Sequence, residues 1–252
     1  MDTIRLLARA DDAGLNETAN RAIRATAAQG IVRNISLMAP APAIADAAEI
    51  LGGLENRVEF GLHVTLTAEW ANVRWGPVTK SASLRQDDGS FHHGVKGISD
   101  SDGDEVIAEV TAQQDRLTRL GFPITYLDEH MGVGSVGGIR TALAAFAKEK
   151  GLRSHYELTD AGRLSALPNW PGPGEHPGTE LADALSSVDA GTYYLVGHPV
   201  FKSEEMELLH KPDSPPGLEM TPRNRQRRMF ADIEIVDYCE NRGIDLIRYR
   251  DV

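Results

Sequence analysis

Short apolar segments alternate with longer amphipathic segments along almost the whole chain, and this alternation most constrains the fold. Seven short segments rich in Val, Ile, Leu and Tyr are predicted as strands, at residues 4–8, 34–38, 58–66, 124–127, 154–158, 193–197 and 246–249. Strands that alternate with helices form a mostly parallel sheet with the helices outside it. Seven such units in one domain favour a closed or nearly closed barrel, although a doubly wound open sheet produces much the same pattern.

Polar and glycine residues mark the predicted helix ends. Asn16 is expected to cap the first helix, because its side chain can accept hydrogen bonds from unpaired backbone N–H groups. Glycines that tolerate a left-handed backbone are expected to end this helix and three later ones, at Gly30, Gly121, Gly151 and Gly243. These residues therefore predict where the helices begin and end.

The 252 residues are expected to form a single domain over residues 1–252, since single α/β barrels commonly have this length. Two loop insertions interrupt the alternation, near residues 68–103 and 165–180. Both are rich in turn-forming residues, and neither is expected to contain a helix or a strand. They are either plain surface loops or the walls of a substrate-binding mouth at one end of a barrel.

Composition excludes several classes of partner. The net charge is −11, from 26 basic and 37 acidic residues, which argues against binding to nucleic acid or to an anionic membrane surface. No signal-peptide pattern opens the chain, and no segment approaches the ~18 continuous apolar residues of a membrane helix, so a cytoplasmic location is expected. The single cysteine, Cys239, excludes an intrachain disulfide. The oligomeric state stays open, with a homodimer as one candidate.

Polar residues stand at the carboxyl ends of four predicted strands. Asp11 and Asp12 follow the first strand, His63 lies late in the third, His130 follows the fourth, and His198 follows a late strand. In a parallel barrel these ends meet on one face, so residues distant in sequence can come together there. One carboxylate and two imidazoles form a common ligand set for a divalent ion. Each residue alone also fits a turn, a helix cap or a core histidine; their conjunction indicates a metal site.

Other kinds of active site find no support. The chain has no G-x-S-x-G segment, and Cys239 lies within a predicted helix, so no motif for nucleophilic catalysis is present. Neither a G-x-G-x-x-G segment nor a phosphate-binding loop follows the first predicted strand, which argues against a nucleotide cofactor.

Several segments together resemble the YdjC/ChbG-like carbohydrate deacetylases, a family that includes chitooligosaccharide deacetylase. The segment ARADDAGLN is similar to the family's opening A-D-D-F-G-L-S, and GLHVTLT is similar to its G-L-H-L-N-L-T. The later segments ITYLDEH and LVGHP resemble the family's D-S-H-x-H and H-P-G. These segments occur in family order and span nearly the full chain, so together they are specific.

This resemblance implies a distorted, TIM-barrel-like (β/α) barrel with mostly parallel strands. It also implies one divalent metal ion bound by Asp12, His63 and His130, with zinc or magnesium expected and manganese or cobalt as alternatives. The implied reaction is hydrolytic removal of N-acetyl groups from amino sugars or short oligosaccharides. The metal would activate the water and Asp11 would act as general base.

Each of the remaining candidate site residues has two possible roles. His198 would protonate the leaving amine or hold the acetyl group. Trp70 and Trp75 would stack on the sugar rings of an N-acetylated substrate or pack their loop onto the barrel.

The chain departs from the family pattern at Gly132, where the second histidine of D-S-H-x-H is expected. Two further hypotheses stay open, and this difference supports only the second of them. One is a metal hydrolase that acts on another amide or ester, and the other is a non-catalytic sugar-binding relative. The intact pair of Asp11 and Asp12 argues against the second, since a binding protein has no obvious use for Asp11.

Overall fold

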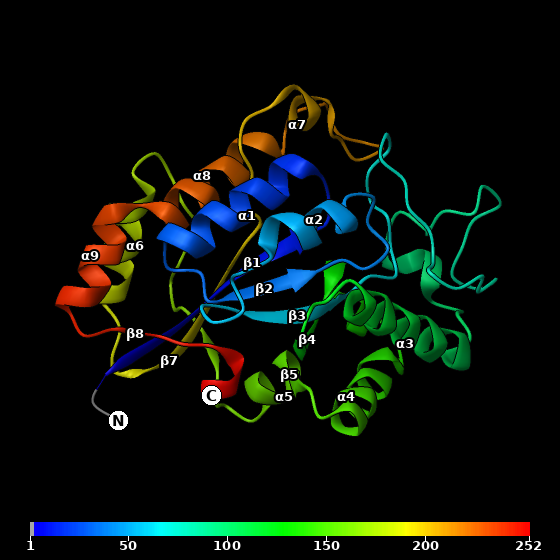
Figure 1. Cartoon of the computed structure of the whole chain (residues 1–252), viewed down its shortest axis with the longest axis horizontal. Helices are drawn as coiled ribbons and strands as arrows, with labels where there is room; N and C mark the ends of the chain where they lie inside the picture. Colours follow the sequence, from blue (N-terminus) through cyan, green and yellow to red (C-terminus); the bar gives the residue numbers. More distant parts are fainter. Residues whose placement is uncertain (1–2) are drawn as a thin grey trace.

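A mostly parallel sheet forms the centre of the structure, a computed structural model that describes residues 3–252 (Figure 1). Its strands are β1 (Ile4–Ala13), β2 (Asn34–Leu37), β3 (Glu59–Val64), β4 (Ile124–Glu129), β5 (Arg153–Ser154), β6 (Ser165–Ala166), β7 (Gly191–Gly197) and β8 (Asp245–Leu246). The strand order is β5-β4-β3-β2-β1-β7-β6, and β8 pairs with the first part of β1. All of these neighbouring strands run parallel.

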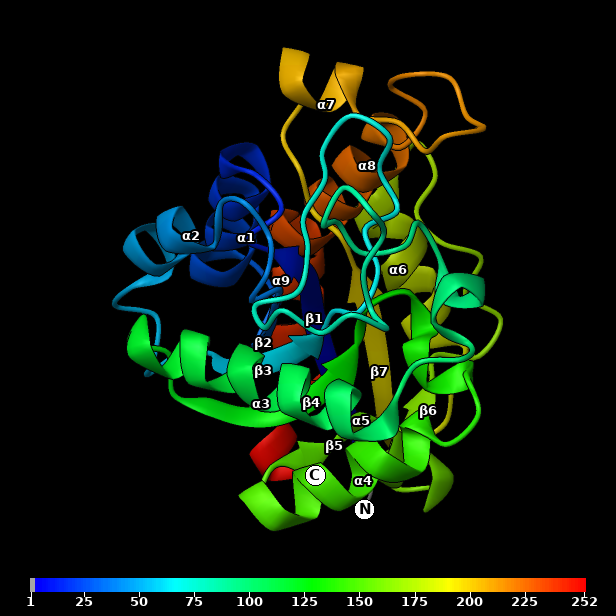
Figure 2. The same ribbon diagram turned by 90° about the vertical axis from the view of Figure 1, so that its right-hand side faces the viewer.

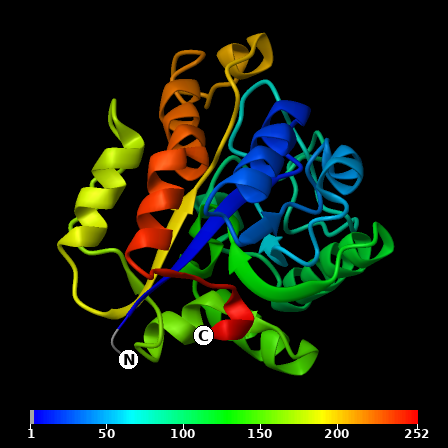
Figure 3. The same cartoon turned by 60° about the vertical axis from the view of Figure 1, so that its left-hand side comes forward.

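Helices surround this curved sheet, which confirms the predicted distorted (β/α) barrel. They are α1 (Glu17–Gln29), α2 (Ile44–Leu51), α3 (Gly103–Arg119), α4 (Ile139–Lys150), α5 (His155–Asp160), α6 (Pro177–Ser186), α7 (Glu204–Leu208), α8 (Met220–Ala231) and α9 (Ile233–Asn241). In Figure 1, α1, α2 and α8 lie above the sheet, and α3 and α4 lie below it. Figure 3 shows α8 and α9 end to end near β7, with α6 beside them. No helix within residues 3–252 is long and apolar enough to cross a membrane.

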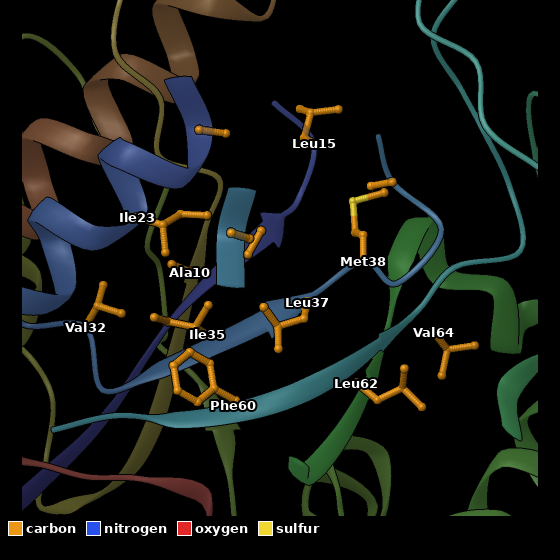
Figure 4. Close-up of a cluster of buried hydrophobic side chains, with 14 of the residues drawn as sticks. Ala10, Leu15, Ile23, Val32, Ile35, Leu37, Met38, Phe60, Leu62 and Val64 are labelled. Atoms are coloured by element: carbon orange, nitrogen blue, oxygen red, sulfur yellow. The ribbon is translucent and has the colours of Figure 1, made fainter. Parts of the chain in front are cut away.

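The two faces of β1 bury different kinds of side chain. Leu6, Ala8 and Ala10 pack in the main apolar core, whereas Leu7 belongs to a smaller cluster with Tyr249. Figure 4 shows the main core between the helices and β1, β2 and β3. Because side chains alternate along a strand, Arg9 and Asp11, the next two odd-numbered positions after Leu7, face away from this core.

Two predicted strands are largely wrong. Residues 154–158 contain only the end of β5, because α5 begins at His155, where the Ser154 side chain accepts a 3.4 Å hydrogen bond from the Glu157 N–H. Residues 246–249 contain the last residue of β8 and the start of a 3-10 helix, η3 (Tyr249–Asp251). Short apolar runs fit a strand and a buried helical turn equally well, so their periodicity could not separate the two.

The helix boundaries follow most of the predicted signals. The Asn16 side chain caps α1 by accepting a 2.8 Å hydrogen bond from the Ala19 N–H. The glycines that follow α3, α4 and α9 have positive φ, as expected: Gly121, Gly151 and Gly243. Gly30 does not, since its φ is −106°. A Cβ atom there would lie 1.8 Å from the Phe230 carbonyl oxygen, so close packing against α8 requires this glycine.

The first insertion lies across the carboxyl ends of the central strands, where Figure 2 shows it in front of β1. Residues 68–103 are mostly irregular, as predicted, but include a short 3-10 helix, η1 (Val95–Ile98), and the first residue of α3. The second insertion is less irregular than predicted. It contains β6, and α6 begins at Pro177, because proline is well tolerated in the first turn of a helix.

Candidate metal centre

The paired aspartates lie at the carboxyl end of β1. This strand extends to Ala13, so Asp11 and Asp12 belong to it and do not follow it as predicted. Asp12 has a φ of 65°, and the pairing of β1 with β2 shifts register between Ala10 and Ala13. Such a bulge re-aims side chains, and aspartate tolerates the left-handed backbone better than most residues. Both carboxylates therefore lie near His63, although consecutive residues of a regular strand face opposite ways.

The structure brings together the three side chains that were expected to bind a metal ion. Oδ1 of Asp12 lies 3.2 Å from Nδ1 of His130 and 3.5 Å from Nε2 of His63. One ligand atom from each residue lies within 4.8 Å of the other two. His63 lies on β3, and His130 begins the 3-10 helix η2 (His130–Ser135) directly after β4. The site is thus built from the ends of β1, β3 and β4.

The outer ring nitrogen of each histidine faces a buried carboxylate. Nδ1 of His63 lies 3.0 Å from Oδ1 of Asp128, and Nε2 of His130 lies 2.9 Å from Oε2 of Glu69. A carboxylate in this position fixes the tautomer and orientation of a metal-binding imidazole. Glu69 belongs to the first loop insertion, so this loop supplies part of the site.

The inner carboxylate oxygen fits a metal ligand. Oδ1 of Asp12 is buried, and among residues 3–252 no group forms a well-aligned hydrogen bond with it. Buried polar atoms are normally paired, so a carboxylate oxygen without a well-aligned partner between two imidazoles fits the role of a metal ligand. The other oxygen of Asp12 accepts a 2.7 Å hydrogen bond from Nη1 of Arg223, which leaves Oδ1 as the inward ligand.

The electrostatic environment keeps these groups charged. Burial alone would raise the pKa of Asp12, but nearby Arg223 and His198 hold this pKa well below its usual value. Burial alone would lower the histidine pKa values, yet Asp128 raises the pKa of His63 to about 10, and Glu69 raises the pKa of His130 to about 9. Without a metal ion, both imidazoles are therefore protonated at neutral pH.

The charges of the site balance in two ways. Four carboxylates meet two arginines and two histidines here: Asp11, Asp12, Glu69, Asp128, Arg9, Arg223, His63 and His130. With both histidines protonated, positive and negative charges are equal. A divalent ion with two neutral imidazoles would carry the same total charge, so metal binding would exchange two protons for one ion.

A second cluster of potential ligands fits a metal ion less well. Asp11, His63 and Asp128 also offer atoms within 4.8 Å of one another. Arg9 already supplies a positive charge there, since its Nε lies 2.7 Å from Asp11 and 2.9 Å from Asp128. We therefore assign the candidate centre to the cluster that contains Asp12.

Two arginines of the site were not predicted. Arg9 lies in β1, and a charged residue within the apolar segment Leu-Leu-Ala-Arg-Ala was a signal that could have identified it. Arg223 lies in α8, where Arg225, Arg227 and Arg228 are close in sequence, so no local feature separated it from ordinary surface arginines.

His198 lies directly after β7, next to the same group of charges. Its side chain is partly exposed, and its backbone N–H donates a 2.7 Å hydrogen bond to Oε1 of Gln226 on α8. Burial lowers the pKa of His198, although the neighbouring Asp12 opposes this effect. The imidazole is therefore neutral at neutral pH.

Both predicted substrate-stacking tryptophans are buried. Trp70 has 0% exposure, and Trp75 has 5%. Nε1 of Trp75 donates a 2.9 Å hydrogen bond to the Thr67 carbonyl oxygen, and its ring centroid lies 6.4 Å from that of His130. In this structure the two rings pack the loop onto the barrel, which is the alternative that the sequence left open.

Gly132, at the departure from the family pattern, lies in η2 just beyond His130. Met131 and Gly132 have φ values of 53° and 63°, so the chain makes a left-handed turn there. A Cβ atom on Gly132 would have no neighbour within 4 Å, so backbone conformation, and not space, disfavours a side chain at this position. Met131 is 45% exposed beside the site.

One known protein family matches almost the whole chain. The sequence profile of the family described as YdjC-like protein matches residues 5–241. This chain belongs to the YdjC-like family. The match confirms the resemblance that was inferred from the motifs, and it includes every candidate ligand.

Two relatives of similar length are named carbohydrate deacetylases. A carbohydrate deacetylase of Listeria monocytogenes serotype 4b is 25% identical over 262 residues, which cover 99% of this chain and 100% of the relative. A carbohydrate deacetylase of Thermoanaerobacter pseudethanolicus is 23% identical over 253 residues, with 97% of each chain covered. The crystal structure of an Enterococcus faecalis protein named for cellobiose-phosphate cleavage has a TM-score of 0.79 at 19% identity, covering 99% of this chain and 98% of that one. At this identity, the structural likeness supports the fold.

Proposed function

We propose that this YdjC-like protein is a metal-dependent hydrolase that removes N-acetyl groups from amino sugars or short oligosaccharides. The observation that carries the proposal is the convergence of Asp12, His63 and His130 around an orphaned carboxylate oxygen, with the Asp11 carboxylate beside them. The relatives named carbohydrate deacetylases support the substrate class.

Each residue near the centre has a role in this reaction. Asp12, His63 and His130 would hold the ion, and Asp128 and Glu69 would orient the two imidazoles. When bound, a divalent ion supplies Lewis acidity, which polarises a carbonyl group and lowers the pKa of a water molecule. This donor set accepts zinc, magnesium, manganese or cobalt.

Asp11 is the base in this scheme. One of its carboxylate oxygens lies within 4.8 Å of a ring nitrogen of His63, so it is next to the centre without belonging to the assigned ligand set. Asp11 takes the proton of the attacking water as the bond to the acetyl carbon forms. The amine then leaves with a proton, and acetate is released.

In this scheme His198 either donates a hydrogen bond to the acetyl oxygen or protonates the leaving amine. Because its pKa is lowered, it begins the reaction neutral and can donate an N–H hydrogen bond to the acetyl oxygen. To protonate the amine, His198 would first have to receive a proton. His198→Gln keeps an N–H donor but cannot transfer a proton. Turnover that survives in this variant supports the acetyl-holding role, and its loss supports the acid role.

Acetate release from N-acetylglucosamine monomers and oligomers tests the function. Each substrate is incubated with chelator-treated protein and with protein reloaded with zinc, magnesium, manganese or cobalt. We expect release that depends on the added metal. Bound metal without acetate release would instead indicate another amide or ester substrate, and absence of metal binding under every condition would support a non-catalytic relative.

A further inference from the structure

Arg9 contacts both Asp11, the proposed base, and Asp128, the carboxylate proposed to orient His63. It is 5% exposed and lies two positions before Asp11 on β1, so both side chains face away from the main core. The guanidinium is buried and lies against the Asp11 carboxylate, so it is placed to act on Asp11.

The contacts of Arg9 restrict its own orientation and that of Asp11. Its Nε and Nη2 donate hydrogen bonds of 2.7 and 2.9 Å to the two oxygens of Asp11. Such a fork fixes the plane of a carboxylate, which a single donor cannot do. Nη1 donates a third bond, of 2.7 Å, to the hydroxyl of Tyr249, so the guanidinium is held on its far side as well.

The same guanidinium connects the base to the metal ligands. Nε of Arg9 lies 2.9 Å from Oδ2 of Asp128, whose other oxygen faces Nδ1 of His63 at 3.0 Å. A continuous chain of charged contacts therefore runs from Asp11 through Arg9 and Asp128 to His63. A shift of Arg9 would move the base relative to the proposed metal position.

A purely structural role explains this arrangement poorly. Burying charged groups costs several kcal/mol per ion before their attraction is counted, and apolar replacements of buried ion pairs are often neutral or stabilising. The neighbouring positions of β1 are apolar, so an apolar residue at position 9 would continue the strand pattern. Positioning of Asp11 explains why two buried hydrogen bonds from Arg9 are present although stability does not require them.

We propose that Arg9 is a positioning residue, which holds the Asp11 carboxylate in the orientation from which it takes a proton and ties it to the metal-binding histidine through Asp128. This inference rests on the proposed function for the role of Asp11. The orientation itself is a property of the chain and can be measured without turnover.

Arg9→Gln and Arg9→Lys test this inference, with Arg5→Gln on the same strand as matched control. Arg9→Gln should lower kcat by up to about 10²–10⁴-fold, the usual contribution of a general base, with little change in KM and with metal still bound. Arg9→Lys keeps the charge without the fork and should recover part of the lost activity. Arg5 is half-buried at the other end of β1, and its replacement should leave kcat unchanged.

A double variant separates positioning from general stability. If Arg9 acts through Asp11, adding Arg9→Gln to Asp11→Asn should lower kcat no further than Asp11→Asn alone. Two independent losses that multiply would overturn the inference, as would wild-type kcat in Arg9→Lys and Arg9→Gln.

Crystal structures of the wild type and Arg9→Gln provide a readout without activity. We expect the Asp11 carboxylate to rotate while the β1 backbone stays in place. An unmoved Asp11 in the variant would disprove positioning by Arg9, even in an active enzyme. Wild-type protein that releases no acetate would count against the proposed function, and a rotated Asp11 would still support the Arg9 inference.

Discussion

His63 and Asp128 are register partners on the neighbouring strands β3 and β4, and Nδ1 of His63 lies 3.0 Å from Oδ1 of Asp128. The parallel sheet itself thus places the orienting carboxylate beside the ligand. Ser36 on β2 adds a 2.8 Å hydrogen bond to Oδ2 of Asp128. Since three adjacent strands contribute, the orientation of His63 is set by the sheet.

Asp128→Asn should therefore weaken metal binding by about 10–100-fold, the usual cost of losing an orienting carboxylate. Competition with a chromogenic chelator measures this affinity directly. Asp160→Asn is the matched control, because Asp160 is 67% exposed on α5. Equal affinities in the two variants would show that Asp128 does not act on His63.

Asp11→Asn should separate catalysis from metal binding. It removes the proposed base and no ligand, so kcat should fall by about 10²–10⁴-fold while the metal content stays the same. His63→Ala removes a ligand and should lose both metal and activity. Elemental analysis beside acetate release measures the two effects. Metal loss in Asp11→Asn would reverse the roles of Asp11 and Asp12, and full activity in His63→Ala would exclude His63 as a ligand.

Metal binding should release protons. The pKa values of His63 and His130, about 10 and about 9, mean that both rings are charged in the metal-free protein at neutral pH. A ligand nitrogen must be deprotonated, so about two protons should leave per ion and affinity should rise up to about pH 10. Calorimetry in buffers of different ionisation enthalpy counts these protons. Binding with no proton release would show that the rings are already neutral.

The same shifts make the stability of the metal-free protein depend on pH. Both histidine pKa values are raised above the unfolded value of 6.5, so their stabilisation is complete below about pH 6.5 and is lost as pH rises through about 9 and about 10. The pKa values of Asp12 and Asp128 are lowered below 3.8, so their stabilisation is present above about pH 3.8 and is lost in acid.

Urea unfolding of chelator-treated protein should accordingly show the highest free energy of unfolding between these limits. Added zinc should restore stability at alkaline pH, since the ion takes the place of the lost protons. A free energy of unfolding that rises from pH 6.5 to about pH 10 without metal would contradict the assigned charge states.

The parts of the site that depend on sheet topology could be predicted from the sequence. Parallel strands bring their carboxyl ends together whatever the details of pairing, so Asp12, His63 and His130 could be placed at one site before any contact was known. The bulge that turns Asp12 toward His63 depends on the pairing of β1 with β2, which the pattern of apolar residues does not encode.

Partners from other layers of the fold could not be predicted in this way. Glu69 reaches His130 from an irregular loop, and Arg223 reaches Asp12 from a helix next to β7. Their positions depend on long-range packing, which the secondary-structure propensity of a local segment does not predict. The close approach of Gly30 to Phe230 has the same origin, since it joins the end of α1 to the end of α8.

Trp70 provides the test that separates packing from sugar stacking. Its side chain is fully buried, and the Arg223 guanidinium carbon lies 5.3 Å from its ring centroid, so the ring supports the arginine that binds Asp12. Trp70→Ala should lower the free energy of unfolding by about 3–5 kcal/mol, as measured by urea denaturation of the metal-free protein. Trp170→Ala is the control, because this partly buried ring in the second insertion should cost less. A raised KM for the sugar with unchanged stability in Trp70→Ala would instead show that the ring opens to stack on substrate.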